Sequence, residues 1–212
     1  MDCVVMVDYD GTIVTFDTGE YVLTKFAGKE WRTVTEQLER GQVGFDESLQ
    51  KEFGMLKVSE QAVLDALEPV VEFRPNFDKL VGYCRATSIP LLIVSGGLDF
   101  SIRHFLEKRD VLDAVEIYGP KSKCTDKGML LTFPEHHFED STNFKEDLVR
   151  YTKSEGKQVL YVGNGIGDYA AAKLADQVFA IKGSKLAELC RRGALPAKEV
   201  TDFQEVVDSV RD

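Results

Sequence analysis

The feature that most constrains the fold is a short apolar run, Val4–Val7, that ends at two aspartates separated by one residue, Asp8 and Asp10. Consecutive apolar residues without alternation are typical of a strand in a parallel sheet whose two faces are both covered. The aspartates then lie at the carboxyl end of that strand, where open α/β sheets bind ligands. Two carboxylates this close repel each other unless a cation separates them or one holds a proton. The pair is therefore a candidate site for Mg²⁺, which prefers hard oxygen ligands; taken alone, it is equally typical of a solvated turn.

Composition limits the partners and the location. The chain has 212 residues and is 43% hydrophobic, enough to bury the core of one domain or of one domain with an insertion. Its formal net charge of −10 argues against nucleic acid and anionic membranes as partners. The four cysteines have no CxxC spacing, and neither a signal region nor an apolar run of membrane-spanning length is present. We expect a cytoplasmic protein, either a monomer or a homodimer.

Residues 15–74 differ from the rest of the chain because their apolar residues recur with a helical period and no strand pattern interrupts them. Three helical faces can be recognised: Trp31, Val34 and Leu38; Leu49, Phe53 and Leu56; Val63, Leu64 and Leu67. The position of this segment directly after the two aspartates predicts a helical cap over the first strand. We expect a core domain of residues 1–14 and 75–212 and a cap domain of residues 15–74. The alternative is a helix pair packed on the sheet.

After residue 74, strand and helix patterns alternate. We expect helices near 76–86, 98–106, 144–154 and 168–175, strands near 90–94, 115–118, 159–162 and 178–181, a hairpin within 119–140, and two amphipathic helices at the end. Such alternation predicts an α/β fold: a Rossmann-like, doubly wound parallel sheet with helices on both faces.

Polar residues follow several of these predicted strands. Ser95 and Gly96 offer a hydroxyl and an unhindered amide where a strand meets a helix, which is a potential anion site or an ordinary turn. Lys145 falls in the first turn of a predicted helix, where the helix macrodipole disfavours a cation. A residue placed against such a local preference indicates a functional role. The alternative is a solvated lysine without a role. Asn164 and Asp168 lie in a glycine-rich turn after a buried strand, where aspartate is also a common N-cap.

Each motif has an ordinary explanation, but their order does not. Along the chain follow a strand with DxDGT, a strand with SGG, a lysine at a helix start and a strand with GNxxxD. In this order of motifs the chain resembles the haloacid dehalogenase superfamily over nearly its whole length. The insertion is similar to the first cap type of that superfamily, in its phosphoserine phosphatase branch. Ser95–Phe100 and Gly54–Leu56 are similar to the enol-phosphate phosphatases of methionine salvage.

The resemblance implies a catalytic pair. Asp8 would attack phosphorus and form an aspartyl phosphate, and Asp10 would protonate the leaving alcohol and then activate water. The nonbridging phosphate oxygens would be bound by Thr12, Ser95, the Gly96 amide and Lys145.

The resemblance also implies a magnesium site. Its ligands would be Asp8, Asp10 through the backbone carbonyl, Asn164 and Asp168. Most members of the superfamily carry aspartate at the position of Asn164, so this chain supplies an amide oxygen with one less negative charge.

Substrate choice is expected to depend on the cap. Asp17 matches the acidic residue with which phosphoserine phosphatases recognise the substrate amine, and Glu52 falls where those enzymes carry a carboxylate-binding arginine. A glutamate there would repel the carboxylate of phosphoserine, which favours an amine-bearing or neutral substrate. Solvated surface charge is the alternative for both residues.

We therefore predict a Mg²⁺-dependent phosphomonoesterase that hydrolyses a small phosphorylated metabolite. Two alternatives remain: a phosphotransferase or mutase, in which a substrate hydroxyl replaces water, and a catalytically silent phosphate-binding module.

Overall fold

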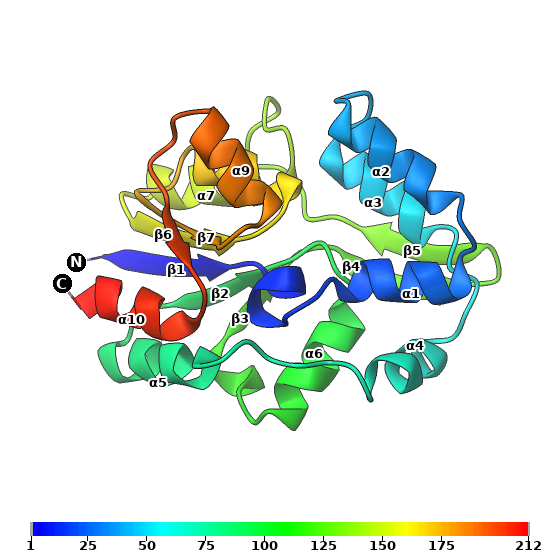
Figure 1. Ribbon diagram of the computed structural model, residues 1–212, viewed down its shortest axis with the longest axis horizontal. Coiled ribbons are helices and arrows are strands. Elements are labelled where there is room, and N and C mark those ends of the chain that lie inside the picture. The colour runs from blue at the N-terminus through cyan, green and yellow to red at the C-terminus, as the bar shows by residue number, and fades with distance from the viewer. Residues whose placement is uncertain (1, 212) are drawn as a thin grey trace.

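The computed structural model describes residues 2–211, and the side chains of residues 2–210. A six-stranded parallel sheet forms its centre, with the order β3-β2-β1-β6-β7-β8, and a two-stranded antiparallel sheet, β4-β5, lies beside it (Figure 1). The strands of the larger sheet are β1 (Cys3–Val7), β2 (Leu91–Val94), β3 (Glu116–Tyr118), β6 (Gln158–Gly163), β7 (Gln177–Ile181) and β8 (Lys198–Val200). The doubly wound parallel sheet predicted from the sequence is therefore confirmed.

Helices cover both faces of this sheet. The helices are α1 (Thr18–Phe26), α2 (Trp31–Glu39), α3 (Phe45–Phe53), α4 (Glu60–Leu67), α5 (Phe77–Thr87), α6 (Asp99–Lys108), α7 (Phe144–Ser154), α8 (Tyr169–Ala172), α9 (Lys185–Arg192) and α10 (Phe203–Arg211). Successive residues of β1 point to opposite faces, so Val5 and Val7 pack with α5, α6 and α10, whereas Val4 and Met6 pack with α7. None of the helices within residues 2–211 combines the length and the hydrophobicity of a membrane-spanning segment.

The strand order places the site. The chain moves outward from β1 to β2 and β3 on one side and from β6 to β7 and β8 on the other, so the order reverses between β1 and β6. These two strands pair in parallel, from Cys3 opposite Gln158 to Val7 opposite Val162, and both end at the same edge of the sheet. A crevice at such a switch point is where doubly wound sheets bind ligands.

Helices α1 to α4 lie between β1 and α5 in the chain, as the helical period predicted. The two ends of this insertion meet at a bridge between Val14 and Phe73. The predicted hairpin is also present, as β4 (Lys121–Thr125) and β5 (Gly128–Thr132). It lies against α3 (Figure 1), and the Leu131 amide donates to Gln50 Oε1 at 3.2 Å. Residues 15–74 therefore share an interface with a segment outside them.

Two local expectations differ from the structure. The helix expected near 168–175 is a 3₁₀ turn, Ile166–Asp168, followed by the short helix α8. Strand β8 was not expected, because three residues of which one is apolar carry no strand pattern. It forms through pairing with β7, where Phe179 faces Lys198.

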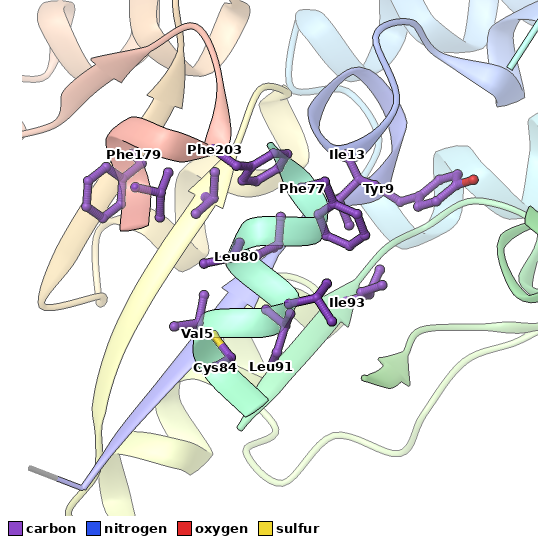
Figure 2. Packing of buried hydrophobic residues seen from close by; sticks show 14 of the residues in the cluster. Val5, Tyr9, Ile13, Phe77, Leu80, Cys84, Leu91, Ile93, Phe179 and Phe203 are labelled. Carbon is purple, nitrogen blue, oxygen red and sulfur yellow. The ribbon is translucent and has the colours of Figure 1, made fainter. Parts of the chain in front are cut away.

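The core beneath the sheet depends on Phe77, the first residue of α5, which is fully buried (Figure 2). Its ring lies 5.9 Å from that of Phe73 and 5.4 Å from that of Phe203. Phe77 therefore joins the end of the insertion, the sheet and the C-terminal helix.

We predict that Phe77→Ala lowers the free energy of unfolding by about 3–5 kcal/mol, because it removes buried area and leaves a cavity between three elements. Urea denaturation followed by circular dichroism measures the change. The matched control is Leu130→Ala on β5, where the side chain is exposed, and we expect a loss of less than about 1 kcal/mol. Equal losses of unfolding free energy in the two variants would show that Phe77 contributes no more to stability than an exposed residue does.

Candidate active site

Asp8 follows β1 directly and is held at the switch point. Its amide donates to the Val162 carbonyl of β6 at 2.9 Å, and its side chain is only 7% exposed. The chain then makes a tight turn, Tyr9–Ile13, in which Gly11 has φ +68°. A Cβ on Gly11 would lie 2.1 Å from Asn164 Nδ2, so this turn requires glycine for both its conformation and its space.

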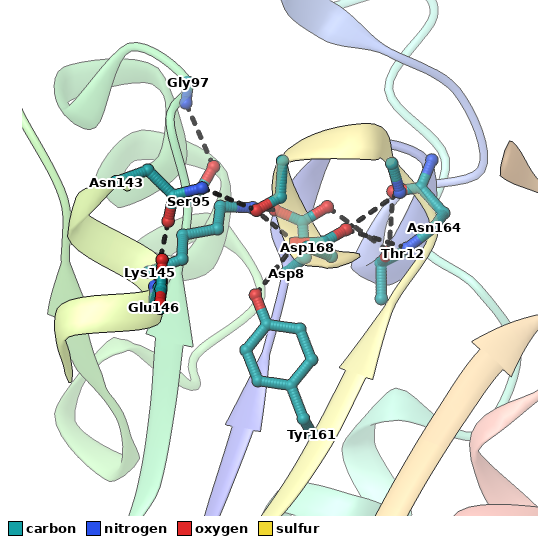
Figure 3. A network of polar contacts seen from close by, with 12 residues as sticks. Asp8, Thr12, Ser95, Gly97, Asn143, Lys145, Glu146, Tyr161, Asn164 and Asp168 are labelled. Carbon is teal, nitrogen blue, oxygen red and sulfur yellow. Dashed lines mark hydrogen bonds and ion pairs between the residues drawn. The ribbon is translucent and has the colours of Figure 1, made fainter. Parts of the chain in front are cut away.

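Lys145 lies in the first turn of α7, as predicted, and is buried rather than solvated. The Asn143 side chain caps the helix by accepting from the Glu146 amide at 2.8 Å. The Lys145 ammonium donates to Asp8 Oδ1 at 2.6 Å and to Asp168 Oδ1 at 2.7 Å (Figure 3). Burial alone would lower the pKa of Lys145, but the charges of Asp168 and Asp8 outweigh burial and raise it. The two carboxylates thus compensate for the unfavourable helix position.

Asp168 accepts hydrogen bonds on both oxygens. Oδ1 accepts from Lys145 and from the Tyr161 hydroxyl at 2.8 Å, and Oδ2 accepts from the amides of Asn164 at 3.0 Å and Gly165 at 2.8 Å. These four donors occupy the acceptor sites of a carboxylate. Direct binding of a metal by Asp168 therefore requires the exchange of one donor, whereas its hydrogen bonds already orient Lys145 and the turn that carries Asn164.

Asp10 lies on the far side of the turn. Its Oδ1 accepts from the backbone amide of Thr18 at 2.9 Å and from the Thr18 hydroxyl. Burial and the charge of Asp17 raise the pKa of Asp10 to about 7, although the bonds from Thr18 oppose the rise. Burial and the charge of Asp168 raise the pKa of Asp8 to about 8, although Lys145 opposes it. The site is therefore short of positive charge.

The predicted phosphate-binding residues lie at two distances from the cavity: some line it, and one is buried behind Asp8. Ser95, Gly96 and Lys145 line the same cavity as Asp8, and the Gly97 amide donates to Ser95 Oγ at 3.0 Å. Thr12 is fully buried behind the carboxylate, with its hydroxyl 3.3 Å from Asp8 Oδ2 and 3.1 Å from Asn164 Oδ1. In this structure the Thr12 side chain contacts the candidate nucleophile rather than the cavity.

The cavity has a volume of about 380 Å³ and extends from the carboxyl ends of the strands to the helices of the insertion. Asp10, Asn164 and Asp168 line its lower part, and Asp17 and Glu52 line its upper part. Asp17 is exposed and caps α1 by accepting from the Glu20 amide at 2.7 Å. Glu52 is buried. The structure thus brings the predicted site residues to one cavity, except Thr12, which lies behind Asp8 and does not line it.

A divalent cation fits this donor set. The carboxylates of Asp8 and Asp168 share one cationic side chain, Lys145, and Asp10 adds a third carboxylate to the same cavity. All these oxygen donors are hard. Among the described residues, no three acidic, His or Cys side chains converge on a single metal-binding position. The cation would therefore need mixed ligands, as in the set that the family resemblance implies, which includes the Asp8 carboxylate, the Asp10 backbone carbonyl and the Asn164 amide oxygen.

Arg74 is a site residue that the sequence analysis missed. Its guanidinium donates to the carbonyls of Thr12 at 2.7 Å, Gly11 at 2.8 Å and Thr201 at 3.3 Å, and its amide donates to Ile13 O at 2.7 Å. It thus ties the Tyr9–Ile13 turn to the end of the insertion and to the segment before α10. No local pattern predicts this role, because every partner is a backbone carbonyl and Thr201 is distant in the sequence.

Comparison with known proteins agrees with this geometry. Residues 5–173 match the model of the haloacid dehalogenase-like hydrolase family. A 2-hydroxy-3-keto-5-methylthiopentenyl-1-phosphate phosphatase from Brevibacillus brevis is 33% identical, over 96% of this chain and 93% of the relative, and one from Geobacillus kaustophilus is 28% identical, over 98% and 95%. A solved phosphoserine phosphatase with an analogue of a phospho-aspartyl intermediate superposes with a TM-score of 0.73 at 20% identity, covering 98% of both chains.

We predict that Arg74→Met lowers the free energy of unfolding by about 2–4 kcal/mol, because the carbonyls of Gly11 and Thr12 lose their donor while remaining largely buried. Denaturant titration measures the loss. Arg40→Met is the matched control: the Arg40 side chain pairs with Glu36 at an exposed position, so we expect a change of about 0–1 kcal/mol. A loss for Arg74→Met no larger than that of the control would contradict the role assigned to the guanidinium.

Proposed function

The chain belongs to the haloacid dehalogenase-like hydrolase family, and from this premise we propose that it is a Mg²⁺-dependent phosphomonoesterase acting through an aspartyl phosphate on a small phosphorylated metabolite. The observation that carries the proposal is the ammonium of Lys145, buried between Asp8 and Asp168 on the cavity wall. This arrangement supports a nucleophilic carboxylate that is fixed in position and has a cation beside it. We further propose that residues 15–74 act as a cap domain and that the protein is cytoplasmic.

In the first step, an Asp8 carboxylate oxygen attacks phosphorus, and the bond from phosphorus to the substrate oxygen breaks. Lys145, the Ser95 hydroxyl and the Gly96 amide bind the nonbridging oxygens, where charge accumulates. Thr12, which contacts Asp8 Oδ2, keeps the carboxylate in position for attack. Mg²⁺ bound by Asp8, the Asp10 carbonyl and Asn164 would supply further charge neutralisation, with Asp168 acting directly or through its hydrogen bonds.

Asp10 supplies the proton for the leaving alcohol. With a pKa of about 7, the Asp10 side chain is protonated in a substantial fraction of the molecules near neutral pH. A general acid is most effective when its pKa is near the working pH. In the second step the ionised Asp10 takes a proton from water as the water oxygen attacks the phosphorus. Phosphate leaves, and the Asp8 carboxylate is restored.

Asp17 and Glu52 are proposed as substrate-specificity residues because both line the cavity beyond the phosphate-binding part. The relatives from Brevibacillus brevis and Geobacillus kaustophilus are named for a methylthio enol phosphate, and the structural neighbour is a phosphoserine phosphatase. Glu52 argues against phosphoserine as the substrate of this chain, because Glu52 lines the same cavity and its carboxylate would repel the carboxylate of phosphoserine.

Two other functions stay open to test. A phosphotransferase or mutase would use the same aspartyl phosphate but pass the phosphoryl group to an alcohol, and a silent module would bind phosphate without turnover. The silent module is considered because of Asn164, whose amide offers the cation one less negative charge than an aspartate would.

We predict that the purified protein releases phosphate from small phosphomonoesters in the presence of Mg²⁺ and that Asp8→Asn lowers kcat by at least about a thousandfold, because an amide is a poor nucleophile. Asp10→Asn should also lower kcat, by about a hundredfold or more, as general acid–base catalysis is lost. Asp113→Asn, at an exposed position outside the cavity, is the matched control and should leave kcat unchanged.

The outcome separates the three functions. Transfer to added glycerol that exceeds hydrolysis would favour the phosphotransferase. Saturable phosphate binding without release from any substrate would favour the silent module. Equal activity in Asp8→Asn and the wild type would overturn the mechanism.

A further inference from the structure

Tyr161 is a fully buried tyrosine beneath the candidate active site. It lies in β6, two residues before that strand ends at Gly163. Its ring belongs to the apolar cluster of Met6 and Phe144, and its hydroxyl donates to Asp168 Oδ1 at 2.8 Å (Figure 3). Asp168 lines the cavity, whereas Tyr161 does not. Any effect of this tyrosine on a bound ligand must therefore pass through a neighbour, and Asp168 is the side chain that its hydroxyl contacts.

The packing of β6 does not account for the hydroxyl. The neighbouring strand residues Val159, Leu160 and Val162 are apolar and buried, and phenylalanine would fill nearly the same space without a polar atom. A buried hydroxyl is costly unless it finds a partner, and the partner here is a carboxylate at the cavity. A hydrogen bond to an ionised carboxylate is about twice as strong as one between neutral groups. The hydroxyl is therefore explained by its effect on Asp168.

The two carboxylates that share Lys145 differ in the number of their donors. Asp168 accepts four hydrogen bonds, of which Lys145 and Tyr161 supply those to Oδ1. Within the described residues, the carboxylate of Asp8 accepts only from Lys145 at 2.6 Å and from the Thr12 hydroxyl at 3.3 Å. Four donors fill the acceptor sites of a carboxylate, and two do not. Asp8 therefore keeps lone pairs for attack on phosphorus, whereas Asp168 has none free.

The position of the Lys145 ammonium depends on this difference. A lysine side chain is flexible, so its ammonium lies where its partners hold it, here 2.6 Å from Asp8 Oδ1 and 2.7 Å from Asp168 Oδ1. Without the Tyr161 hydroxyl, Oδ1 of Asp168 would have a free acceptor site and would attract the ammonium more strongly, since charges interact strongly in poorly solvated surroundings. The ammonium would then move toward Asp168 and away from Asp8.

We propose that Tyr161 is a positioning residue for phosphoryl transfer: its hydroxyl shares Asp168 Oδ1 with Lys145 and thereby keeps the ammonium beside Asp8, where the phosphoryl oxygens gather charge. The hydroxyl takes no part in bond formation or proton transfer. The position of the ammonium matters most in the transition state, because the charge that it stabilises develops there. Loss of the hydroxyl therefore lowers kcat more than it weakens the binding of substrate.

Because this role rests on the proposed phosphatase function, the experiment measures hydrolysis of p-nitrophenyl phosphate, with Mg²⁺ titrated to saturation for the wild type and each variant. Tyr161→Phe should lower kcat about tenfold, change KM by less than about threefold and raise the inhibition constant of orthovanadate about tenfold. Orthovanadate is the probe because vanadium, like phosphorus in the transition state, can bind five oxygens. A merely structural hydroxyl would change the stability of the protein without changing kcat relative to KM.

Tyr83→Phe is the matched control. Tyr83 is a half-buried residue of α5 outside the cavity, and its hydroxyl donates to the Val210 carbonyl at 3.3 Å. The substitution also removes one hydrogen-bonded hydroxyl and keeps the ring, so we expect kcat and the inhibition constant of orthovanadate to stay at their wild-type values. All rates are measured at a temperature at which circular dichroism shows the variants to be folded.

The proposed function and the role of Tyr161 fail differently. No Mg²⁺-dependent hydrolysis by the wild type would overturn the phosphatase function. Hydrolysis by the wild type, with kcat and the inhibition constant unchanged in Tyr161→Phe, would overturn the positioning role alone. A loss of kcat that additional Mg²⁺ restores would also overturn it, because the hydroxyl would then act on cation binding. An equal loss in Tyr83→Phe would contradict it as well.

Discussion

The site depends on one buried interaction, the ammonium of Lys145 held between Asp8 and Asp168. These residues come from α7, the end of β1 and the turn after β6, so the contact exists only when the sheet is assembled and its order reverses between β1 and β6. One cation among three carboxylates leaves the cluster with excess negative charge in poorly solvated surroundings, which is destabilising without a further cation. The same imbalance that makes the cluster costly makes it suited to a divalent ion and a phosphate ester.

The insertion is coupled to this cluster through α3. Asp46 Oδ2 accepts from the Phe144 amide at 3.1 Å, next to Lys145, and the Phe45 ring lies 5.7 Å from the Lys145 ammonium. A Cβ on Gly167 would lie 2.4 Å from the Phe45 ring, so the helix approaches the strand ends as closely as glycine permits. The helices that line the upper cavity are thereby fixed relative to the candidate nucleophile, which is the condition for selecting a substrate by its tail.

The sequence predicted the elements and residues whose signals are local. Apolar runs that end in polar motifs located the strands and the residues at their ends, and the unfavourable helix-start position singled out Lys145, which the structure buries between two carboxylates. The sequence could not predict features that depend on tertiary contacts. Arg74 binds backbone carbonyls, and the Lys198–Val200 strand exists only through pairing with β7. The burial of Glu52 was likewise invisible, because an isolated glutamate on an amphipathic helix reads as solvated.

The central claim, that the cluster is completed by a divalent cation, is tested most directly by calorimetric titration of Mg²⁺ into metal-free protein in two buffers of different ionisation enthalpy, which counts the protons released. The pKa of Asp8, about 8, lies above the ordinary carboxyl value, so Asp8 holds a proton below that pH, whereas Asp10 would bind the cation only through its backbone carbonyl. Since a cation binds the ionised carboxylate of Asp8, the account predicts proton release on binding at about pH 6.5 that falls toward zero at about pH 9. Binding without proton release at the lower pH, or no saturable binding at either, would contradict it.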